Sequence, residues 1–164
     1  MRTRSSTPQT LPCSVVFIRY IIVSTTQFTL FAGVQVRLDC NNIMKGREAE
    51  NGEVIVTKAY NLPSKFIFHT VGPVIYGRVT EENKSDLAKC YRNCLNKADE
   101  MKLKSIAFCC ISTGVFGYPK EEAALLAVKV VQQYKAQTSS SLKIIFDVFT
   151  EKDYALYRRI LEKN

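Results

Sequence analysis

The sequence predicts an α/β domain in which a mainly parallel sheet lies between two layers of helices. Segments typical of strands and of helices alternate from residue 53 to the end of the chain. The strand segment 105–111 is apolar without alternation, which is typical of a strand covered on both faces, and 142–149 is expected to be another buried strand. The chain has 164 residues, of which 46% are hydrophobic and 23% charged, so it can bury one core and is not of the disordered class.

The first half of the domain is expected to contain one helix and two strands. Residues 32–44 carry spaced apolar side chains and are expected to form a short helix. The strands are expected over 53–57 and 65–71, where short apolar runs are bounded by polar or turn-forming residues. A loop is expected over 74–84.

The second half is expected to alternate helix and strand. An amphipathic helix is predicted over 85–101, with Ser85 as its cap and one apolar face. The strand at 105–111 leads through a loop into a helix that begins at Pro119. The last helix is expected over 151–163, with these apolar residues facing inward: Tyr154, Tyr157, Ile160 and Leu161.

The net charge of +8 is unevenly placed along the chain. Residues 1–38 contain four arginines and no acidic residue, whereas residues 39–164 mix both signs. A positive balance favours a polyanionic partner: nucleic acid, a membrane surface or a phosphorylated small molecule. The apolar stretch 14–33 allows a signal peptide or a membrane segment, although Arg19 and several threonines interrupt it. A basic, membrane-associated protein is therefore one alternative.

The chain contains six cysteines. A chain of this length with an apolar core needs no disulfide framework, so we expect reduced thiols and a cytoplasmic protein. Cys90 and Cys94 lie one helical turn apart, but a zinc site needs further ligands. The only histidine, His69, lies within an apolar strand. No metal site is expected in this chain.

The segment most informative about chemistry is ISTGVFGYP, residues 111–119, between a buried strand and a helix. Gly114 and Gly117 let the backbone approach a ligand closely. The backbone N–H groups and the following helix N-terminus form an anion-binding concavity. No lysine lies within the loop, so it is not a Walker A loop. The expected ligand is a diphosphate held by the main chain; the alternative is an ordinary turn between a strand and a helix.

Residues 105–119 resemble the second ADP-ribose-binding loop of macrodomains. Further segments resemble the family in the same order: 54–73, 85–98, 121–131 and 143–157. The resemblance covers 32–164 and implies a three-layer α-β-α fold. It implies ADP-ribose or an ADP-ribosylated protein as the partner, with neither nucleic acid nor a membrane.

The resemblance also implies the site residues. The loop that holds the diphosphate and ribose would consist of Ser112, Thr113, Gly114, Val115, Phe116, Gly117 and Tyr118. Phe149 lies where macrodomains commonly stack an aromatic ring on adenine; the alternative is a core phenylalanine at a strand end. His69 resembles the structural strand histidine of the family.

AGVQVRLDC, residues 32–40, resembles the helix of zinc-containing macrodomains, which remove ADP-ribose from proteins. In that group a preceding segment supplies Cys, His and Cys to zinc and an Asp-Asn pair beside the distal ribose. Neither this segment nor the first strands of the family are recognisable in residues 1–31. We therefore expect a non-homologous segment, 1–31, and a partial, N-terminally incomplete macrodomain, 32–164.

This division leaves the activity open. The family implies hydrolysis of ADP-ribose from modified proteins, and intact members hold zinc. This chain lacks the recognisable zinc ligands and catalytic segment, so no catalytic residue and no cofactor are assigned to it. The alternative is a binding module that holds ADP-ribose without turnover.

Residues 3–31 resemble a frame-shifted version of the family's N-terminal part. In a shifted reading frame, each codon consists of the third base of one codon and the first two bases of the next codon. Read in this frame, the possible codons of residues 23–31 allow a different amino-acid sequence. That sequence is Cys-Ile-Asp-Asn-Ala-Ile-His-Thr-Phe, as in the zinc-containing group. A genuine divergent N-terminus is the alternative.

Overall fold

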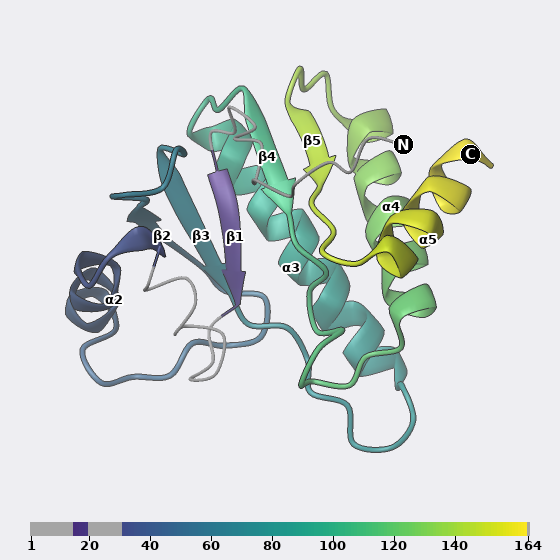
Figure 1. Cartoon of the computed structure of the whole chain (residues 1–164), viewed down its shortest axis with the longest axis horizontal. Helices are drawn as coiled ribbons and strands as arrows, with labels where there is room; N and C mark the ends of the chain where they lie inside the picture. The colour runs from purple at the N-terminus through teal and green to yellow at the C-terminus, as the bar shows by residue number, and fades with distance from the viewer. Residues whose placement is uncertain (1–14, 20–30, 164) are drawn as a thin grey trace, which may run out of the picture.

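The structure is a computed structural model that describes residues 31–163 and the backbone of residues 15–19. Its sheet has the order β2-β3-β1-β4-β5 (Figure 1). β2 runs antiparallel to β3, and the other neighbours are parallel, which confirms a mainly parallel sheet. The strands are β1 (Val15–Arg19), β2 (Val54–Lys58), β3 (Phe66–Thr70), β4 (Ser105–Phe108) and β5 (Lys143–Phe146).

Helices cover both faces of this sheet, as predicted. They are α2 (Gln35–Met44), α3 (Glu81–Glu100), α4 (Lys120–Gln137) and α5 (Glu151–Glu162). Successive residues of β3 point to opposite faces: Ile67 packs with Val36 and Cys40 of α2, whereas Phe68 belongs to the core shared with α3 and α4. Figure 1 shows α2 apart from the group formed by α3, α4 and α5. The larger part of the core lies beneath this group.

β1 corrects one expectation. No strand was expected before residue 32, yet Val15–Arg19 forms the central strand, paired with β3 and β4. The segment is rich in β-branched and aromatic residues, which favour strands. Arg19 is the last residue of β1, so the charged residue lies at the end of the strand instead of interrupting it.

α3 begins four residues earlier than predicted. Its N-cap is Thr80, whose side chain accepts from the backbone N–H of Asn83 while the Asn83 side chain accepts from the backbone N–H of Thr80. Glu81 and Glu82 lie in the first turn, where they complement the helix dipole. This first turn is polar, so apolar periodicity does not detect it.

β4 and β5 end earlier than expected, at Phe108 and Phe146. Every residue of β4 is buried, as predicted, but β5 is only half-buried because it lies at the end of the sheet. Two residues expected to face inward, Tyr154 and Leu161, are exposed on α5. Among the helices in the described part of the chain, none is both long and apolar enough to cross a membrane.

Candidate functional site

The candidate site lies where the parallel strands β4 and β5 end. Both strands point in the same direction, so the segments 109–119 and 147–150 leave the sheet at the same edge (Figure 1). The backbone N–H of Asp147 donates to the carbonyl of Phe108 at 2.7 Å, which carries the pairing one step beyond β5. The loop after β4 and the segment that contains Phe149 therefore start side by side.

The loop after β4 is closed by its own hydrogen bonds. The backbone N–H of Tyr118 donates to Ser112 O at 3.0 Å, and that of Gly117 donates to Gly114 O at 2.9 Å. The Thr113 hydroxyl donates to Cys110 O at 3.0 Å. Gly117 has a φ of +71°, in the left-handed region that glycine adopts without strain. The loop thus has a fixed shape before any ligand arrives.

A second segment, residues 71–79, supports this loop from the side of β3. The backbone N–H of Ile75 donates to Phe116 O at 2.8 Å. A Cβ at Gly72 would lie 2.3 Å from Ser112 Oγ and 2.7 Å from Ile111 Cγ2, so only glycine permits this approach. Ser112 itself is fully buried and has a φ of +63°. Its hydroxyl faces Gly72 and has no hydrogen-bond partner among the described residues. Strained residues of this kind concentrate at ligand sites.

The seven predicted loop residues divide into two groups. Three are buried and anchor the loop: Ser112, Phe116 and Tyr118. Gly114, Val115 and Gly117 are exposed, and Thr113 is half-buried. The hydroxyls of Ser112 and Thr113 are not offered to solvent, because the first is buried and the second donates inside the loop.

The exposed part of the loop can bind an anion with its main chain. The backbone N–H groups of Gly114 and Val115 have no acceptor within the described residues. α4 begins immediately after the loop, at Lys120, so its N-terminal N–H groups and positive dipole end lie next to it. These groups suit a phosphate or diphosphate.

Phe149 stands beside this edge with its side chain fully exposed, at 101% relative accessibility. It directly precedes Thr150, the N-cap of α5. The alternative interpretation of Phe149 as a core residue is therefore wrong. An exposed aromatic ring next to an anion-binding loop is available for stacking on a flat ligand.

An ion pair that sequence reasoning missed joins the two segments. Lys120 Nζ donates to both carboxylate oxygens of Asp153, at 2.8 and 3.0 Å, and the Thr150 hydroxyl donates to the same carboxylate at 2.7 Å. Burial alone would raise the pKa of Asp153, but the hydrogen bonds from Lys120 and Thr150 and the Lys120 charge hold it below its ordinary value. The two partners are 33 residues apart, so no local signal could have identified them.

Tyr76, on the supporting segment 71–79, is an exposed aromatic residue near the loop that was not predicted from the sequence. Its side chain is 89% exposed, one residue after the Ile75 contact with the loop. A tyrosine directly after VGPVI, between a strand and a helix, is the signal that could have identified it.

His69 lies away from the loop, in the pairing between β2 and β3. Its Nε2 is 2.9 Å from Thr57 Oγ1 and 3.8 Å from Cys40 Sγ. Burial lowers the pKa of His69 to about 4, and burial together with Asp39 raises that of Cys40. The pair is a neutral imidazole and a protonated thiol, which is a structural arrangement rather than an activated nucleophile.

The described residues do not fit a zinc ion. They contain no group of three or more His, Cys, Asp or Glu side chains placed to hold a metal. Cys90 and Cys94 are fully buried within the core face of α3, and burial raises the pKa of Cys90 to about 11. Zinc binds thiolates and neutral imidazoles that converge on one point, and these side chains do not converge.

Comparisons with known proteins agree with this geometry. A family model described as the Macro domain matches residues 25–127. The chain is 51% identical over 136 residues to a protein-ADP-ribose hydrolase of Staphylococcus aureus strain MRSA252; the match covers 81% of this chain and 51% of that protein. The chain therefore spans about half the length of this curated relative.

Solved structures show the same fold. A macrodomain of Oceanobacillus iheyensis with ADP has a TM-score of 0.84 and 34% identity, over 93% of this chain and 85% of that chain. A Trypanosoma brucei macrodomain in complex with ADP-ribose has a TM-score of 0.80 and 28% identity, over 92% of this chain and 64% of that chain. The predicted three-layer α/β/α macrodomain architecture is confirmed. On sequence and structure together, this chain belongs to the macro domain family.

Proposed function

We propose that this chain binds ADP-ribose, free or attached to a protein, at the edge formed by residues 112–118 and Phe149. The observation that carries the proposal is the main-chain surface of Gly114 and Val115, whose N–H groups have no acceptor among the described residues and lie beside the N-terminus of α4. Such a surface suits the diphosphate. The exposed ring of Phe149 on the neighbouring segment suits adenine. The relatives with ADP and with ADP-ribose support this ligand.

The described part of the chain is better suited to binding than to hydrolysis. The titratable groups next to the loop are poor catalysts: Asp153 is held by Lys120 and Thr150, and burial together with Asp153 raises the pKa of the Cys110 thiol. No metal-binding cluster is present among the described residues. We therefore propose a module that binds its ligand without turnover.

Hydrolysis of ADP-ribose from modified proteins is the second candidate. The observation that favours it is the 51% identity to a protein-ADP-ribose hydrolase. The two candidates differ in one measurement, release of ADP-ribose from an ADP-ribosylated protein incubated with the purified chain. Release above that of the protein-free control would establish the second candidate.

Calorimetry with ADP-ribose tests the binding site. Gly114 is not among the residues with positive φ, so valine can adopt its backbone conformation. Gly114→Val therefore places a side chain on the exposed surface of the loop. We expect binding to the unchanged chain and none to this variant. Leu125→Ala, an exposed apolar residue of α4, is the control that should bind normally. Binding unaffected by Gly114→Val would overturn the assignment of the loop.

The cellular location follows from the cysteines. Five of them are described, and they form no disulfide with one another; Cys40, Cys90, Cys94 and Cys110 are free thiols. Unpaired thiols in this number are typical of a reducing compartment. We propose the cytoplasm.

A further inference from the structure

Among the described strands, β5 is the outermost strand on one side of the sheet, next to β4. Within the described residues it pairs only with β4. All four residues of β4 are buried, whereas Lys143 is exposed and Ile144, Ile145 and Phe146 are half-buried. Natural sheets usually cover or protect such an edge, because its unpaired N–H and C=O groups recruit another strand.

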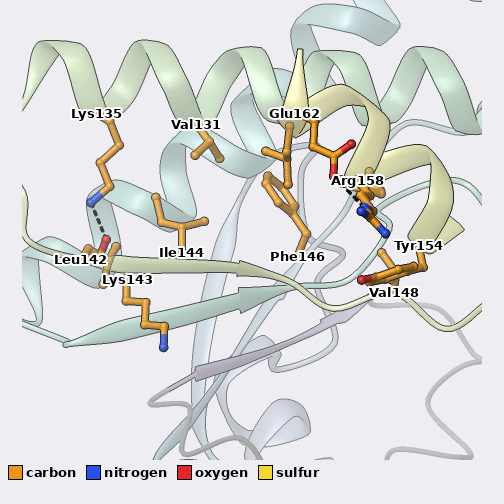
Figure 2. A pocket seen from close by; sticks show the side chains of 12 residues that line it. Val131, Lys135, Leu142, Lys143, Ile144, Phe146, Val148, Tyr154, Arg158 and Glu162 are labelled. Carbon is orange, nitrogen blue, oxygen red and sulfur yellow. Dashed lines mark hydrogen bonds and ion pairs between the residues drawn. The ribbon is translucent and has the colours of Figure 1, made fainter. Parts of the chain in front are cut away.

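An apolar groove of about 660 Å³ lies along this edge, between β5, α4 and α5. Figure 2 shows Ile144 and Phe146 pointing from β5 toward α4. On α5 the groove is bordered by Tyr154 and Leu161, which are 56% and 49% exposed. An apolar groove beside an unpaired strand indicates a surface that another strand covers.

Four charged residues line the groove, and three of them have partners among the described residues. Lys135 donates to Ser140 O and Leu142 O, and Arg158 pairs with Glu162. Lys143, the first residue of β5, and Asp147, which follows its last residue, are exposed and form no side-chain hydrogen bond or ion pair with the described residues. They carry opposite charges and are four residues apart.

The backbone pattern limits how a strand can add to this edge. The N–H groups of Lys143 and Asp147 point to β4, at 3.0 Å from Lys104 O and 2.7 Å from Phe108 O. Because neighbouring residues of a strand alternate, the backbone groups of Ile144 and Phe146 point outward. An antiparallel partner must therefore pair with these two residues.

We propose that two copies of this chain associate by antiparallel pairing of β5 with β5, with Ile145 of one copy opposite Ile145 of the other. This register sets Ile144 of each copy opposite Phe146 of the other. The outward N–H and C=O groups of one copy then face those of the other and can form hydrogen bonds. It also sets Lys143 of each copy opposite Asp147 of the other. Shifting the register by one hydrogen-bonding step in either direction loses both charge pairs.

The arrangement has two-fold symmetry, so each contact occurs twice. Ile144 and Phe146 of the two copies lie side by side on the face that carries α4, and they extend the apolar layer across the interface. The charge pairs lie on the opposite face of the joined sheet, because residues of odd and even number alternate between faces. The second copy thus pairs with the backbone groups, covers the apolar groove and neutralises the two charges that have no partner within the described part of the chain.

Sedimentation velocity of the full chain in a dilution series tests the proposal. We expect a reversible dimer. Lys143→Glu places two acids opposite each other, and Asp147→Lys places two bases opposite each other, so each variant should be monomeric. The double variant Lys143→Glu/Asp147→Lys exchanges the charges and should dimerise again. Lys129→Glu, the same charge change on the exposed face of α4, should leave the dimer intact.

Amide hydrogen exchange gives a second measurement. The N–H groups of Ile144 and Phe146 should be protected at high concentration and lose protection on dilution, while circular dichroism stays unchanged. A monomeric wild type would overturn the proposal; protection that does not depend on concentration would show that a segment of the same chain, such as residues 1–14, covers the edge. Single variants that remain dimeric, or a double variant that does not recover, would overturn this register.

Discussion

Lys120 holds both carboxylate oxygens of Asp153, and this ion pair joins the first residue of α4 to the first turn of α5. The loop 112–118 ends where α4 begins, and Phe149 lies one residue before the N-cap of α5. The ion pair therefore fixes the distance between the two parts of the proposed ligand site. The Asp153 side chain is 9% exposed, so this pair is shielded far more than an ordinary surface pair.

Asp153→Asn is expected to lower the free energy of unfolding by about 1–3 kcal/mol, because hydrogen bonds to a charged group are lost. Urea unfolding at neutral pH measures the change. Because the pKa of Asp153 is lowered in the folded state, its contribution is complete above the unfolded value near 3.8 and disappears as the pH falls through the folded value. Glu162→Gln breaks the exposed Arg158 pair and is the control, for which we expect no measurable change. Equal stability of both variants would contradict the role given to Asp153.

His69→Gln should change how stability depends on pH. Burial lowers the pKa of His69 from 6.5 to about 4, so the unfolded chain takes up the proton first. The stability contributed by the neutral ring is complete above pH 6.5 and is lost as the pH falls toward 4. This shift corresponds to roughly 3 kcal/mol. Denaturant unfolding across this range should show a smaller acid loss for the glutamine variant than for wild type; parallel curves would contradict the assignment.

Phe149→Ala should weaken ADP-ribose binding without a change in stability. The ring is fully exposed, so it contributes nothing to the core. Stacking of a base on an aromatic ring contributes about 1–3 kcal/mol, and about 1.4 kcal/mol is tenfold in affinity. Calorimetry should therefore show a loss of about five- to 150-fold in affinity. Phe149→Tyr, which keeps the ring, should bind like wild type, and an unchanged affinity of the alanine variant would remove Phe149 from the site.

Purified chain is expected to hold no stoichiometric zinc. The candidate ligands are dispersed: Cys90 and Cys94 lie in the core, and His69 Nε2 faces Thr57. Residues 1–30 add one cysteine and no histidine or acidic residue. Elemental analysis measures the metal, and one zinc per chain that survives dialysis would contradict the expectation.

The sequence predicted the layers and most elements because burial of strands and apolar periodicity of helices are local signals. The features that were missed or misplaced depend on contacts between residues far apart in the sequence. β1 was missed because residues 1–31 were interpreted as a non-homologous, frame-shifted segment in which no strand of the family was recognisable. β5 was expected to be buried, yet it is only half-buried because it lies at one side of the sheet formed by the described strands. The apolar residues of a strand do not reveal its place in the strand order.

The ligand-binding role of the candidate site stays a prediction, and only part of its geometry could be expected from the sequence. The two glycines of ISTGVFGYP identified the loop, but the division into buried anchors and exposed amides depends on the contact with residues 71–79. The Lys120–Asp153 pair and the Gly72–Ser112 approach join residues that are far apart in the sequence. Neither leaves a local pattern.

The approach of Gly72 to Ser112 gives a test of how the loop is supported. Gly72→Ala would place a methyl group 2.3 Å from Ser112 Oγ and 2.7 Å from Ile111 Cγ2. Overpacking of this kind costs about 1–3 kcal/mol, so we expect a lower free energy of unfolding and weaker ADP-ribose binding. Ser112→Gly removes the hydroxyl and fits a φ of +63° without strain, so alone it should have a smaller effect.

The double variant Gly72→Ala/Ser112→Gly separates a specific clash from general damage. With the Ser112 side chain gone, only the Ile111 contact remains, so the double variant should regain part of the stability lost by Gly72→Ala. Urea unfolding of the four proteins gives the coupling between the two positions. Losses that simply add would show that the two segments do not touch, and the loop would then need another support.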